Sequence, residues 1–363
     1  MSGTSAVRIL LSGYYGFGNF GDDALLKVIV RELRTRHPYA RIEVLSQEPE
    51  MTSHDLGIFA TPRADLGAVR AAIERSDIVL SGGGGLLQNS TSMRSLLYYA
   101  GILRTAIHAR KRAMIFAQSI GPLDFWGKQA VKECCRGLTA ATVRDERSRV
   151  LLRSLLGGVS IERTADPVFL YDLPEGSAPP SGLSGGTPSV VVCPRKTSWQ
   201  PELVERMAEA VDRLCERHGA RAMFVSFGGP SDADVATLII RKCRTKPMLV
   251  PVESFDAAAA IIAAADLVIG VRLHALILAA RLGVPFLAVP YDPKVAALSE
   301  DLAYPLPPFW VPGERSRAED GLLLLDRAWN ERTTLAAHLR SKLPGIQALA
   351  RANFEVLDGI LPS

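Results

Sequence analysis

Short runs of apolar and β-branched residues alternate with longer segments of helical periodicity along nearly the whole chain. Continuous apolar strands that alternate with helices are typical of a parallel sheet covered on both faces. In the first half we expect strands at 7–12, 41–46, 77–81, 113–118 and 140–144. We expect the intervening helices at 22–36, 66–75, 93–109 and 126–137. The alternation therefore predicts an α/β fold.

A segment dense in Gly, Pro and Ser interrupts this alternation at 173–189 and has the composition of a linker. The pattern then restarts, with expected strands at 190–193, 221–227, 248–252, 267–271 and 285–290. Expected helices lie at 201–218, 232–243, 255–265 and 274–282, and the segment 317–361 is helical by pattern. A length of 363 residues suits two domains, which we predict as doubly wound, Rossmann-like domains at 1–175 and 190–363 with a linker at 176–189. Because such sheets bind ligands beyond the carboxyl ends of their strands, two facing domains would place a cleft between them.

Charge and cysteine usage exclude several classes of protein. The 42 basic against 38 acidic residues leave a net charge of +4, too little to indicate nucleic-acid binding but compatible with an anionic substrate or membrane surface. The five cysteines show neither C-x-x-C pairs nor zinc-ligand spacing, which favours reduced core thiols and predicts no metal site. We see no secretory signal and no apolar run of membrane-spanning length, so we expect a cytoplasmic protein.

A glycine-rich loop, Gly13-Tyr-Tyr-Gly-Phe-Gly-Asn-Phe-Gly-Asp-Asp23, follows the first expected strand. Its glycines match the dinucleotide fingerprint, but the loop is longer than the usual tight turn. Asp22 and Asp23 also stand where a pyrophosphate would need the positive end of a helix. Asp22 can instead cap the helix, which is worth about 1 kcal/mol. Alternatively, the carboxylates, amides and aromatics of the loop suit a hydroxyl-rich ligand such as a sugar.

Four consecutive glycines follow the third expected strand, in Ser81–Gln88. Such a run lets the backbone approach a ligand closely or expose its N–H groups to an anion. Tight packing against the neighbouring loop is the alternative. On the ligand interpretation, the loop residues that line an acceptor site or cleft are Gly16, Asn19, Gly21, Gly83 and Gly84.

Basic residues stand at the carboxyl ends of several expected strands. Arg144 ends the strand at 140–144, where its guanidinium can bind a carboxylate or phosphate through two parallel hydrogen bonds. An ion pair with Asp145 or Glu146 is the alternative. Asp166-Pro167 has the sequence of a turn.

The strongest such junction is Arg272-Leu-His274, where a buried strand meets a helix, and Lys294 follows the next strand. A single histidine is more often a core residue whose ring nitrogens are hydrogen-bonded within the protein. This one, however, stands beside an arginine at a strand end. Arg144, Arg272, Lys294 and His274 together predict a site for a small, multiply charged anion.

Six short motifs occur in a fixed order over most of residues 7–295: Gly13-Tyr-Tyr-Gly-Phe-Gly-Asn-Phe-Gly-Asp22, Ser81-Gly-Gly-Gly-Gly-Leu86, Phe116-Ala-Gln-Ser-Ile-Gly-Pro122, Val143-Arg-Asp145, Asp166-Pro167 and Arg272-Leu-His274. With these motifs the chain resembles the polysaccharide pyruvyltransferase family, and most of all its CsaB-type bacterial members. The resemblance implies a GT-B-like fold, meaning two Rossmann-like domains that face a central cleft. It also implies transfer of pyruvate from phosphoenolpyruvate to a sugar as a cyclic ketal, with release of phosphate.

The resemblance implies roles for individual residues. Phosphoenolpyruvate, a substrate rather than a cofactor, would contact Arg144, Arg272, His274 and Lys294. His274 would act as the acid, since imidazole exchanges protons near neutral pH. Asp22 would orient or deprotonate the sugar hydroxyl, and the reaction requires no metal or other cofactor.

The acceptor implied is an N-acetylhexosamine of a cell-wall polysaccharide, as in surface-layer anchoring, or of an exopolysaccharide. A lipid-linked acceptor would require peripheral contact with the inner membrane face. Three alternatives remain at this point: a GT-B glycosyltransferase that uses a nucleotide sugar, a non-catalytic carbohydrate-binding module, and a nicotinamide dehydrogenase. The paired glutamates typical of retaining GT-B enzymes do not occur between Glu253 and Glu319.

Overall fold

Strands and helices alternate as expected, and all strand pairs in the described residues are parallel. The structure is a computed structural model that describes residues 6–180, 186–311 and 318–362. Two compact units divide the chain: the first holds the described residues up to Gly18, Asp22–Leu170 and the chain from Gln347 onward, and the second holds Asn19–Gly21 and Tyr171–Ile346. This division differs from the expected domains in three places: Asn19–Gly21 and residues 171–175 group with the second unit, and the residues from Gln347 onward group with the first.

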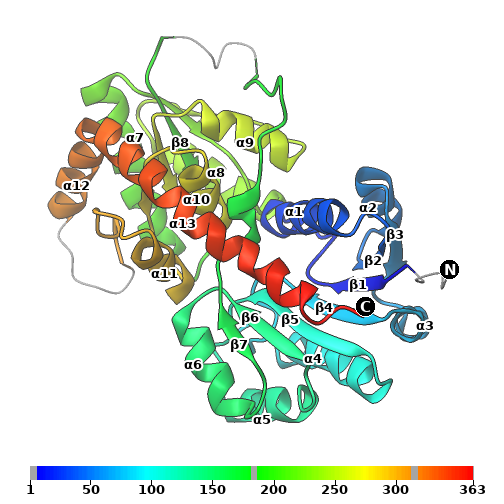
Figure 1. Cartoon of the computed structure of the whole chain (residues 1–363). Helices are drawn as coiled ribbons and strands as arrows, with labels where there is room; N and C mark the ends of the chain where they lie inside the picture. The colour runs from blue at the N-terminus through cyan, green and yellow to red at the C-terminus, as the bar shows by residue number, and fades with distance from the viewer. Residues whose placement is uncertain (1–5, 181–185, 312–317, 363) are drawn as a thin grey trace. The chain divides into compact units, whose positions relative to one another are not determined.

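The first unit contains a seven-stranded sheet in the order β3-β2-β1-β4-β5-β6-β7. Its strands are β1 (Arg8–Ser12), β2 (Arg41–Ser46), β3 (Phe59–Pro62), β4 (Ile78–Gly82), β5 (Arg112–Gln118), β6 (Ala140–Val143) and β7 (Ile161–Arg163). Its helices are α1 (Phe20–Arg36), α2 (Pro49–Leu56), α3 (Leu66–Arg75), α4 (Met93–His108), α5 (Phe125–Cys134) and α6 (Glu146–Leu155), with a 3-10 turn at Pro167–Leu170. Helices α3 to α6 contact one another in succession along one face of the sheet, while α1 covers the other face (Figure 1). This two-sided cover explains why every residue of β4 is buried.

The second unit contains a five-stranded sheet in the order β10-β9-β8-β11-β12. Its strands are β8 (Ser189–Cys193), β9 (Arg221–Phe224), β10 (Met248–Leu249), β11 (Leu267–Gly270) and β12 (Phe286–Ala288). Its helices are α7 (Gln200–His218), α8 (Pro230–Lys242), α9 (Phe255–Ala263), α10 (Leu273–Arg281), α11 (Pro293–Asp301) and α12 (Ala318–Asn330). In each sheet the strand order reverses at one point, between β1 and β4 in the first and between β8 and β11 in the second. Both units are therefore doubly wound and Rossmann-like, as expected.

Local sequence chemistry sets where several helices begin. Aspartate or serine side chains accept hydrogen bonds from the first backbone N–H groups of α3, α4, α5, α6 and α9, which is the usual way to satisfy these exposed donors. The capping residues are Asp65, Ser92, Asp124, Asp145 and Ser254.

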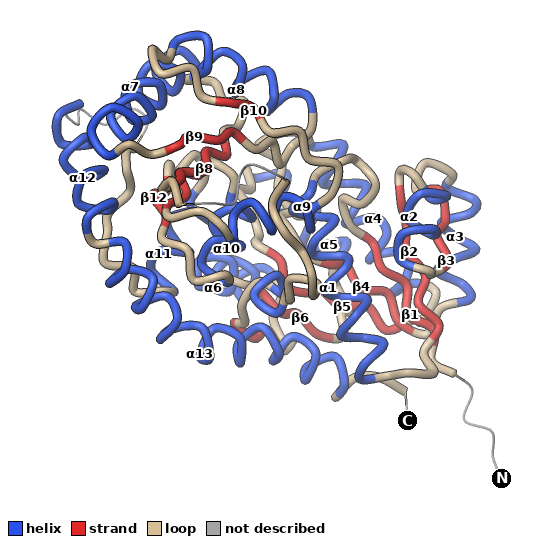
Figure 2. The backbone as a smooth tube through the Cα atoms, turned by 90° about the horizontal axis from the view of Figure 1, so that it is seen from above, coloured by secondary structure: helices blue, strands red, loops and turns tan. Residues whose placement is uncertain are grey.

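The last helix, α13 (Arg332–Asp358), takes part in both units and is continuous despite Pro344 (Figure 2). Near its start, His338 hydrogen-bonds to the Leu302 carbonyl at 2.9 Å. Near its end, the Asn353 amide donates to the Ala165 carbonyl at 2.8 Å. One helix thus contributes hydrogen bonds to both units.

The cysteines are all unpaired thiols, as expected, and four of the five are buried. No helix in the described part of the chain is long and apolar enough to cross a membrane.

Candidate functional site

The two glycine-rich loops lie at the strand-order reversal of the first sheet, after β1 and β4. Gly83 and Gly84 both have left-handed backbone, with φ of 70° and 69°. A Cβ at Gly84 would lie 2.9 Å from Asp22 Oδ1, and one at Gly83 would lie 2.9 Å from the Leu25 side chain. These glycines therefore allow the β4 loop to lie against α1, so the packing interpretation explains their presence. The same contact brings together Gly84 and Asp22, two of the predicted site residues.

Tyr15 anchors the loop that follows β1. Its ring is fully buried, and its hydroxyl donates a hydrogen bond to the Gly82 carbonyl at 2.8 Å. Burial raises the pKa of this phenol, and the nearby Asp22 charge adds to the shift. A Cβ at Gly13 would lie 2.3 Å from the Tyr15 ring, so only glycine allows this close turn. The loop after β1 is thereby held against the end of β4.

The two carboxylates of the loop lie in the first turn of α1, because the helix begins at Phe20, three residues earlier than it would if Asp22 were the cap. Asp22 is buried and Asp23 is half-buried. Burial, with the Asp22 charge as the second cause, raises the pKa of Asp23 to about 7, although a hydrogen bond from the Gly16 backbone N–H opposes the shift. A carboxyl group that titrates near neutrality can act as a general acid or base. The sequence analysis assigned a catalytic role to Asp22 and not to Asp23. The pair of adjacent carboxylates could have indicated that one of the two has a raised pKa.

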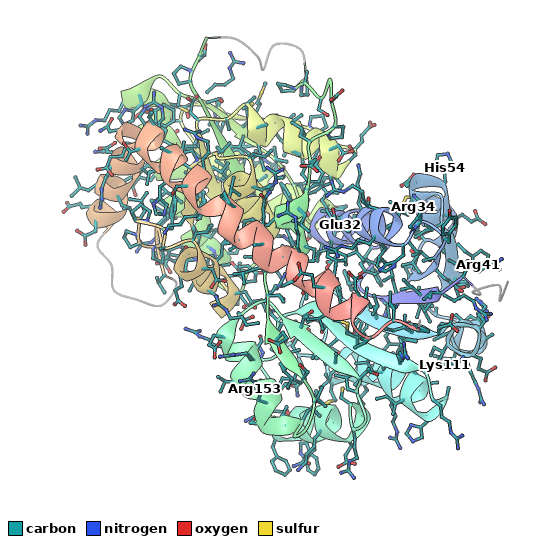
Figure 3. All side chains as sticks on the ribbon, viewed as in Figure 1. Glu32, Arg34, Arg41, His54, Lys111 and Arg153 are labelled. Atoms are coloured by element: carbon teal, nitrogen blue, oxygen red, sulfur yellow. The ribbon has the colours of Figure 1, made fainter. Side chains whose placement is uncertain are left out.

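Arg144 has carboxylate and hydroxyl partners of its own at the carboxyl end of β6. Its Nε donates to Ser119 Oγ at 2.8 Å, and its Nη1 forms an ion pair with Asp166. Exposed arginines such as Arg34 and Arg153 project from the surface of this unit (Figure 3), whereas Arg144 is only 8% exposed. Its contact with phosphoenolpyruvate stays a prediction.

The neighbours of Arg144 have structural roles. The alternative of an ion pair with Asp145 or Glu146 is wrong, because Arg144 pairs with Asp166. Asp145 caps α6, and Glu146 forms an ion pair with Arg149. Asp166-Pro167 forms the expected turn, in which Asp166 accepts a hydrogen bond from the Val168 N–H. This turn presents the Asp166 carboxylate to Arg144.

In the second unit, Arg272 lies at the strand-order reversal, two residues after the end of β11 and directly before α10. Asp232 of α8 is fully buried and holds the guanidinium by two hydrogen bonds, from Nε at 2.6 Å and from Nη2 at 2.9 Å. A Cβ at Gly228 would lie 1.8 Å from Arg272 Nη2, so the guanidinium lies directly on this backbone. The Gly-Gly-Pro sequence after β9 was the available signal for this contact, and sequence reasoning missed both Gly228 and Asp232.

His274 lies in the first turn of α10, and the Asn19–Gly21 segment lies against it. A Cβ at Gly21 would lie 2.1 Å from His274 Nδ1. The Phe20 N–H donates to the Phe227 carbonyl at 3.0 Å, which fixes the segment in place. Asn19 Oδ1 in turn accepts a weak hydrogen bond from the Gly21 N–H at 3.3 Å. The structure thus brings Gly21 and His274, which the sequence analysis assigned to different domains, into direct contact.

Two further cations follow strands at the same edge of the second sheet. Lys294 lies 3.7 Å from the Asp292 carboxylate, which caps α11. Arg195 follows β8; its guanidinium lies 4.2 Å from the centre of the Tyr291 ring and donates to the Tyr291 hydroxyl at 2.7 Å. Sequence reasoning missed Arg195, although an arginine two residues after a buried strand was a usable signal.

The carboxyl edge of the second sheet therefore has the chemistry of an anion site. Arg195, Arg272 and Lys294 follow β8, β11 and β12, whose parallel direction brings their carboxyl ends to one edge. The N-terminal end of α10, which includes His274, adds the positive end of a helix. Guanidinium groups bind carboxylates and phosphates through paired hydrogen bonds, and an ammonium adds a point charge.

Solved structures of other proteins share this fold. The chain is similar to Anabaena Alr3699/HepE in complex with UDP and glucose, with a TM-score of 0.67, 12% identity and coverage of 98% of this chain and 100% of that one. It is similar to S. aureus MnaA in a co-structure with UDP, with a TM-score of 0.68, 11% identity and coverage of 98% and 96%. It is also similar to the UDP-GlcNAc 2-epimerase from Neisseria meningitidis, with a TM-score of 0.64, 10% identity and coverage of 97% and 99%. At these identities the likeness concerns the fold, which is GT-B-like with two Rossmann-like domains.

Sequence comparison then identifies the family within this class. The model of the polysaccharide pyruvyl transferase family matches residues 19–293, and the chain belongs to that family. The match spans the segment from the glycine-rich loop to the residues after β12. A comparison with curated proteins found no match.

Proposed function

We propose that this protein is a ketal pyruvyltransferase that moves pyruvate from phosphoenolpyruvate onto two hydroxyls of one sugar. The observation that supports this most is the arrangement of Arg195, Arg272 and Lys294 at one sheet edge with His274 in the adjoining helix turn. Phosphoenolpyruvate is a compact anion with a carboxylate and a phosphate, which suits such a set of cations. Membership in the pyruvyl transferase family supports the same substrate.

Two of these cations are pre-oriented by their partners. Asp232 engages Nε and Nη2 of Arg272, which fixes the direction of the guanidinium. Tyr291 holds Arg195 by both its ring and its hydroxyl. Side chains fixed before the substrate arrives lose little conformational entropy on binding, which strengthens binding. We keep Arg144 as a predicted contact of phosphoenolpyruvate, with Asp166 as its positioning partner.

The reaction balances with one acid and one base. Imidazolium of His274 donates a proton to the methylene carbon of phosphoenolpyruvate, which becomes a methyl group and leaves cationic character at C2. One sugar hydroxyl oxygen bonds to C2 and loses its proton to a base. The C2–O bond to phosphate then breaks with its electron pair on phosphate, and the second hydroxyl oxygen bonds to C2. Its proton leaves with phosphate, so the products are a cyclic ketal and hydrogen phosphate.

We assign the base to the carboxylates that follow the glycine-rich loop. Asp23, with its pKa near neutrality, can accept the hydroxyl proton. Asp22 raises the pKa of Asp23 and, as predicted from the sequence, can orient the hydroxyl. The proposed lining of the acceptor site remains Gly16, Asn19, Gly21, Gly83 and Gly84.

For the acceptor we propose an N-acetylhexosamine of a cell-wall polysaccharide or exopolysaccharide, as in CsaB-type members and surface-layer anchoring. We place this activity in the cytoplasm, at the inner membrane face when the acceptor is lipid-linked.

The test is an incubation of the purified protein with phosphoenolpyruvate and a panel of aminosugar acceptors, followed by phosphate release and product mass. We expect one phosphate per sugar and a product heavier by one pyruvate less one water. His274→Gln should still bind phosphoenolpyruvate but lose turnover. Transfer from a nucleotide sugar, with phosphoenolpyruvate untouched, would show a GT-B glycosyltransferase instead.

A further inference from the structure

Two aromatic rings stack on the outer side of the loop that follows β1. The rings of Tyr14 and Phe17 have centroids 4.0 Å apart and planes within 8° of each other. Each side chain remains 39% exposed, whereas Tyr15 between them is buried. Large aromatic groups normally gain free energy by burial, so a parallel pair held at the surface requires an explanation.

Arg63, which follows β3, contacts the Phe17 ring of this pair. Its guanidinium lies 4.9 Å from the centre of the Phe17 ring and 4.3 Å from that of Tyr98 in α4. It also donates to the Tyr99 hydroxyl at 3.1 Å, while the Tyr98 hydroxyl donates to the Arg63 carbonyl at 2.9 Å. These cation–π and hydrogen-bond contacts join the loop to β3 and α4. The exposed rings are therefore fixed in orientation before any ligand binds.

The loop that carries the two rings also hydrogen-bonds to the Asp23 carboxylate, which lies in the first turn of α1. Gly16, between Tyr14 and Phe17, donates its backbone N–H to Asp23. Gly16 has a left-handed φ of 75°, and a Cβ there would lie 2.4 Å from Ser46 Oγ. The backbone that joins the rings to the carboxylate is thus closely packed, and the two features keep a constant spacing.

We propose that the Tyr14–Phe17 pair is a stacking platform for a pyranose ring of the acceptor, an inference that rests on the proposed function. One face of a pyranose presents C–H groups, which are attracted to the electron-rich face of an aromatic ring. Its rim presents hydroxyls, which hydrogen-bond to carboxylates such as Asp23. The platform therefore positions an acceptor hydroxyl beside the base.

Charge favours a neutral sugar over a nucleotide at this place. A nucleobase can also stack on aromatic rings, but its phosphates would approach Asp22 and Asp23, whose negative charges repel them. The uncharged hydroxyls of a sugar are not repelled in this way. We therefore propose a saccharide as the ligand of the Tyr14–Phe17 pair.

The first test separates acceptor binding from phosphoenolpyruvate binding. Tyr14→Ala and Phe17→Ala should each raise the KM for the acceptor about three- to tenfold, with the KM for phosphoenolpyruvate within about twofold of the wild type. Tyr14→Phe keeps the ring and should restore the wild-type KM, which a general effect on loop folding would not produce. Phe59→Ala, at an exposed aromatic 64% accessible at the start of β3, is the matched control and should change neither KM. An unchanged acceptor KM in both alanine variants would overturn the platform while leaving the transferase intact.

The second test needs no turnover, so it also applies if the proposed function fails. Saturation-transfer NMR with the full-length protein would use N-acetylglucosamine and N-acetylmannosamine as probes and UDP as the counter-probe. We expect transfer to the ring protons of at least one sugar in the wild type and its loss in Tyr14→Ala. The platform is overturned if neither sugar binds, if Tyr14→Ala binds as the wild type does, or if the variant loses UDP binding alone. Absence of phosphate release with every acceptor, alongside intact sugar binding, would reject the transferase and not the platform.

Discussion

Asp22 and Asp23 share one helix turn, and their charges make it costly to ionise both. Asp23 is the one whose pKa rises to about 7, from burial first and from Asp22 second. A raised carboxyl pKa means that the folded protein binds this proton more tightly than the unfolded chain does. The stability contributed by protonated Asp23 is fully present below pH 3.8, its ordinary value, and is lost as pH rises through about 7.

Asp23→Asn should therefore flatten the pH dependence of stability. We expect the wild type to lose on the order of 2 kcal/mol relative to this variant between pH 5 and pH 8. Urea denaturation at both pH values measures the difference. Glu74→Gln, at an exposed carboxylate of α3, is the control and should follow the wild type. Parallel curves for Asp23→Asn and the wild type would show that Asp23 titrates normally.

The orientation of the Arg272 guanidinium depends on its two hydrogen bonds to Asp232. Arg272→Lys keeps the charge but cannot form the two hydrogen bonds to Asp232. We expect the KM for phosphoenolpyruvate to rise more than about tenfold, a change equal to roughly 1.4 kcal/mol. Lys242→Arg, on the exposed end of α8, is a control that should leave this KM unchanged. Wild-type kinetics in Arg272→Lys would remove Arg272 from the binding site.

Sequence alone could identify residues at strand ends but not their partners. Arg272 and His274 stand at a strand-to-helix junction that the apolar pattern makes visible. Asp232 is 40 positions away and becomes a partner only through the order β9-β8-β11. Asp23 was missed because a periodic pattern does not determine how deeply each of two adjacent carboxylates is buried.

At the scale of elements, glycines decide how closely loops and helices approach. Gly21 lies where a Cβ would meet His274 Nδ1 at 2.1 Å, whereas Gly101 inside α4 has open space around its Cβ position. The two positions make a matched pair of glycine-to-alanine changes.

Gly21→Ala should displace His274 and reduce kcat at least about tenfold. Gly101→Ala should stabilise the fold by about 1 kcal/mol, because alanine has a better helix propensity than glycine. Phosphate release and thermal unfolding measure the two effects. Full activity in Gly21→Ala would mean that the histidine does not depend on this contact.

The end of α13 belongs to the core of the first unit. Phe354 is fully buried and meets Phe116 of β5 edge to face at 5.1 Å. Phe354→Ala should therefore destabilise the protein by about 3–5 kcal/mol. Leu349→Ala, an exposed residue one turn earlier, should cost far less in the same denaturation experiment. Equal losses would indicate that the helix end does not pack as described.

The sequence predicted α13 as helical but not its partners. An amphipathic pattern shows that a helix has an apolar face, but it does not say which sheet covers that face. Short elements were also missed, among them β3, β7 and α2, because two or three apolar residues are too few to establish a period. Longer segments such as α3 were predicted with their observed bounds.

At the scale of the whole molecule, the topology explains why the predicted motifs follow strands. Both sheets reverse their strand order next to a glycine-rich or arginine-bearing loop, which is where doubly wound sheets bind ligands. The alternation of strands and helices was enough to predict this architecture. The domain boundaries were harder to predict, since the tripeptide Asn19–Gly21 joins the second unit through tertiary contacts alone.

In the proposed reaction a sugar receives pyruvate after protonation of the methylene carbon of phosphoenolpyruvate. Deuterium from the solvent reports on that protonation. In heavy water with phosphoenolpyruvate and an aminosugar acceptor, we predict a ketal whose methyl group holds one deuterium, formed in equal amount to phosphate and absent with His274→Gln. A pyruvylated sugar without that deuterium, or consumption of a nucleotide sugar in place of phosphoenolpyruvate, would contradict it.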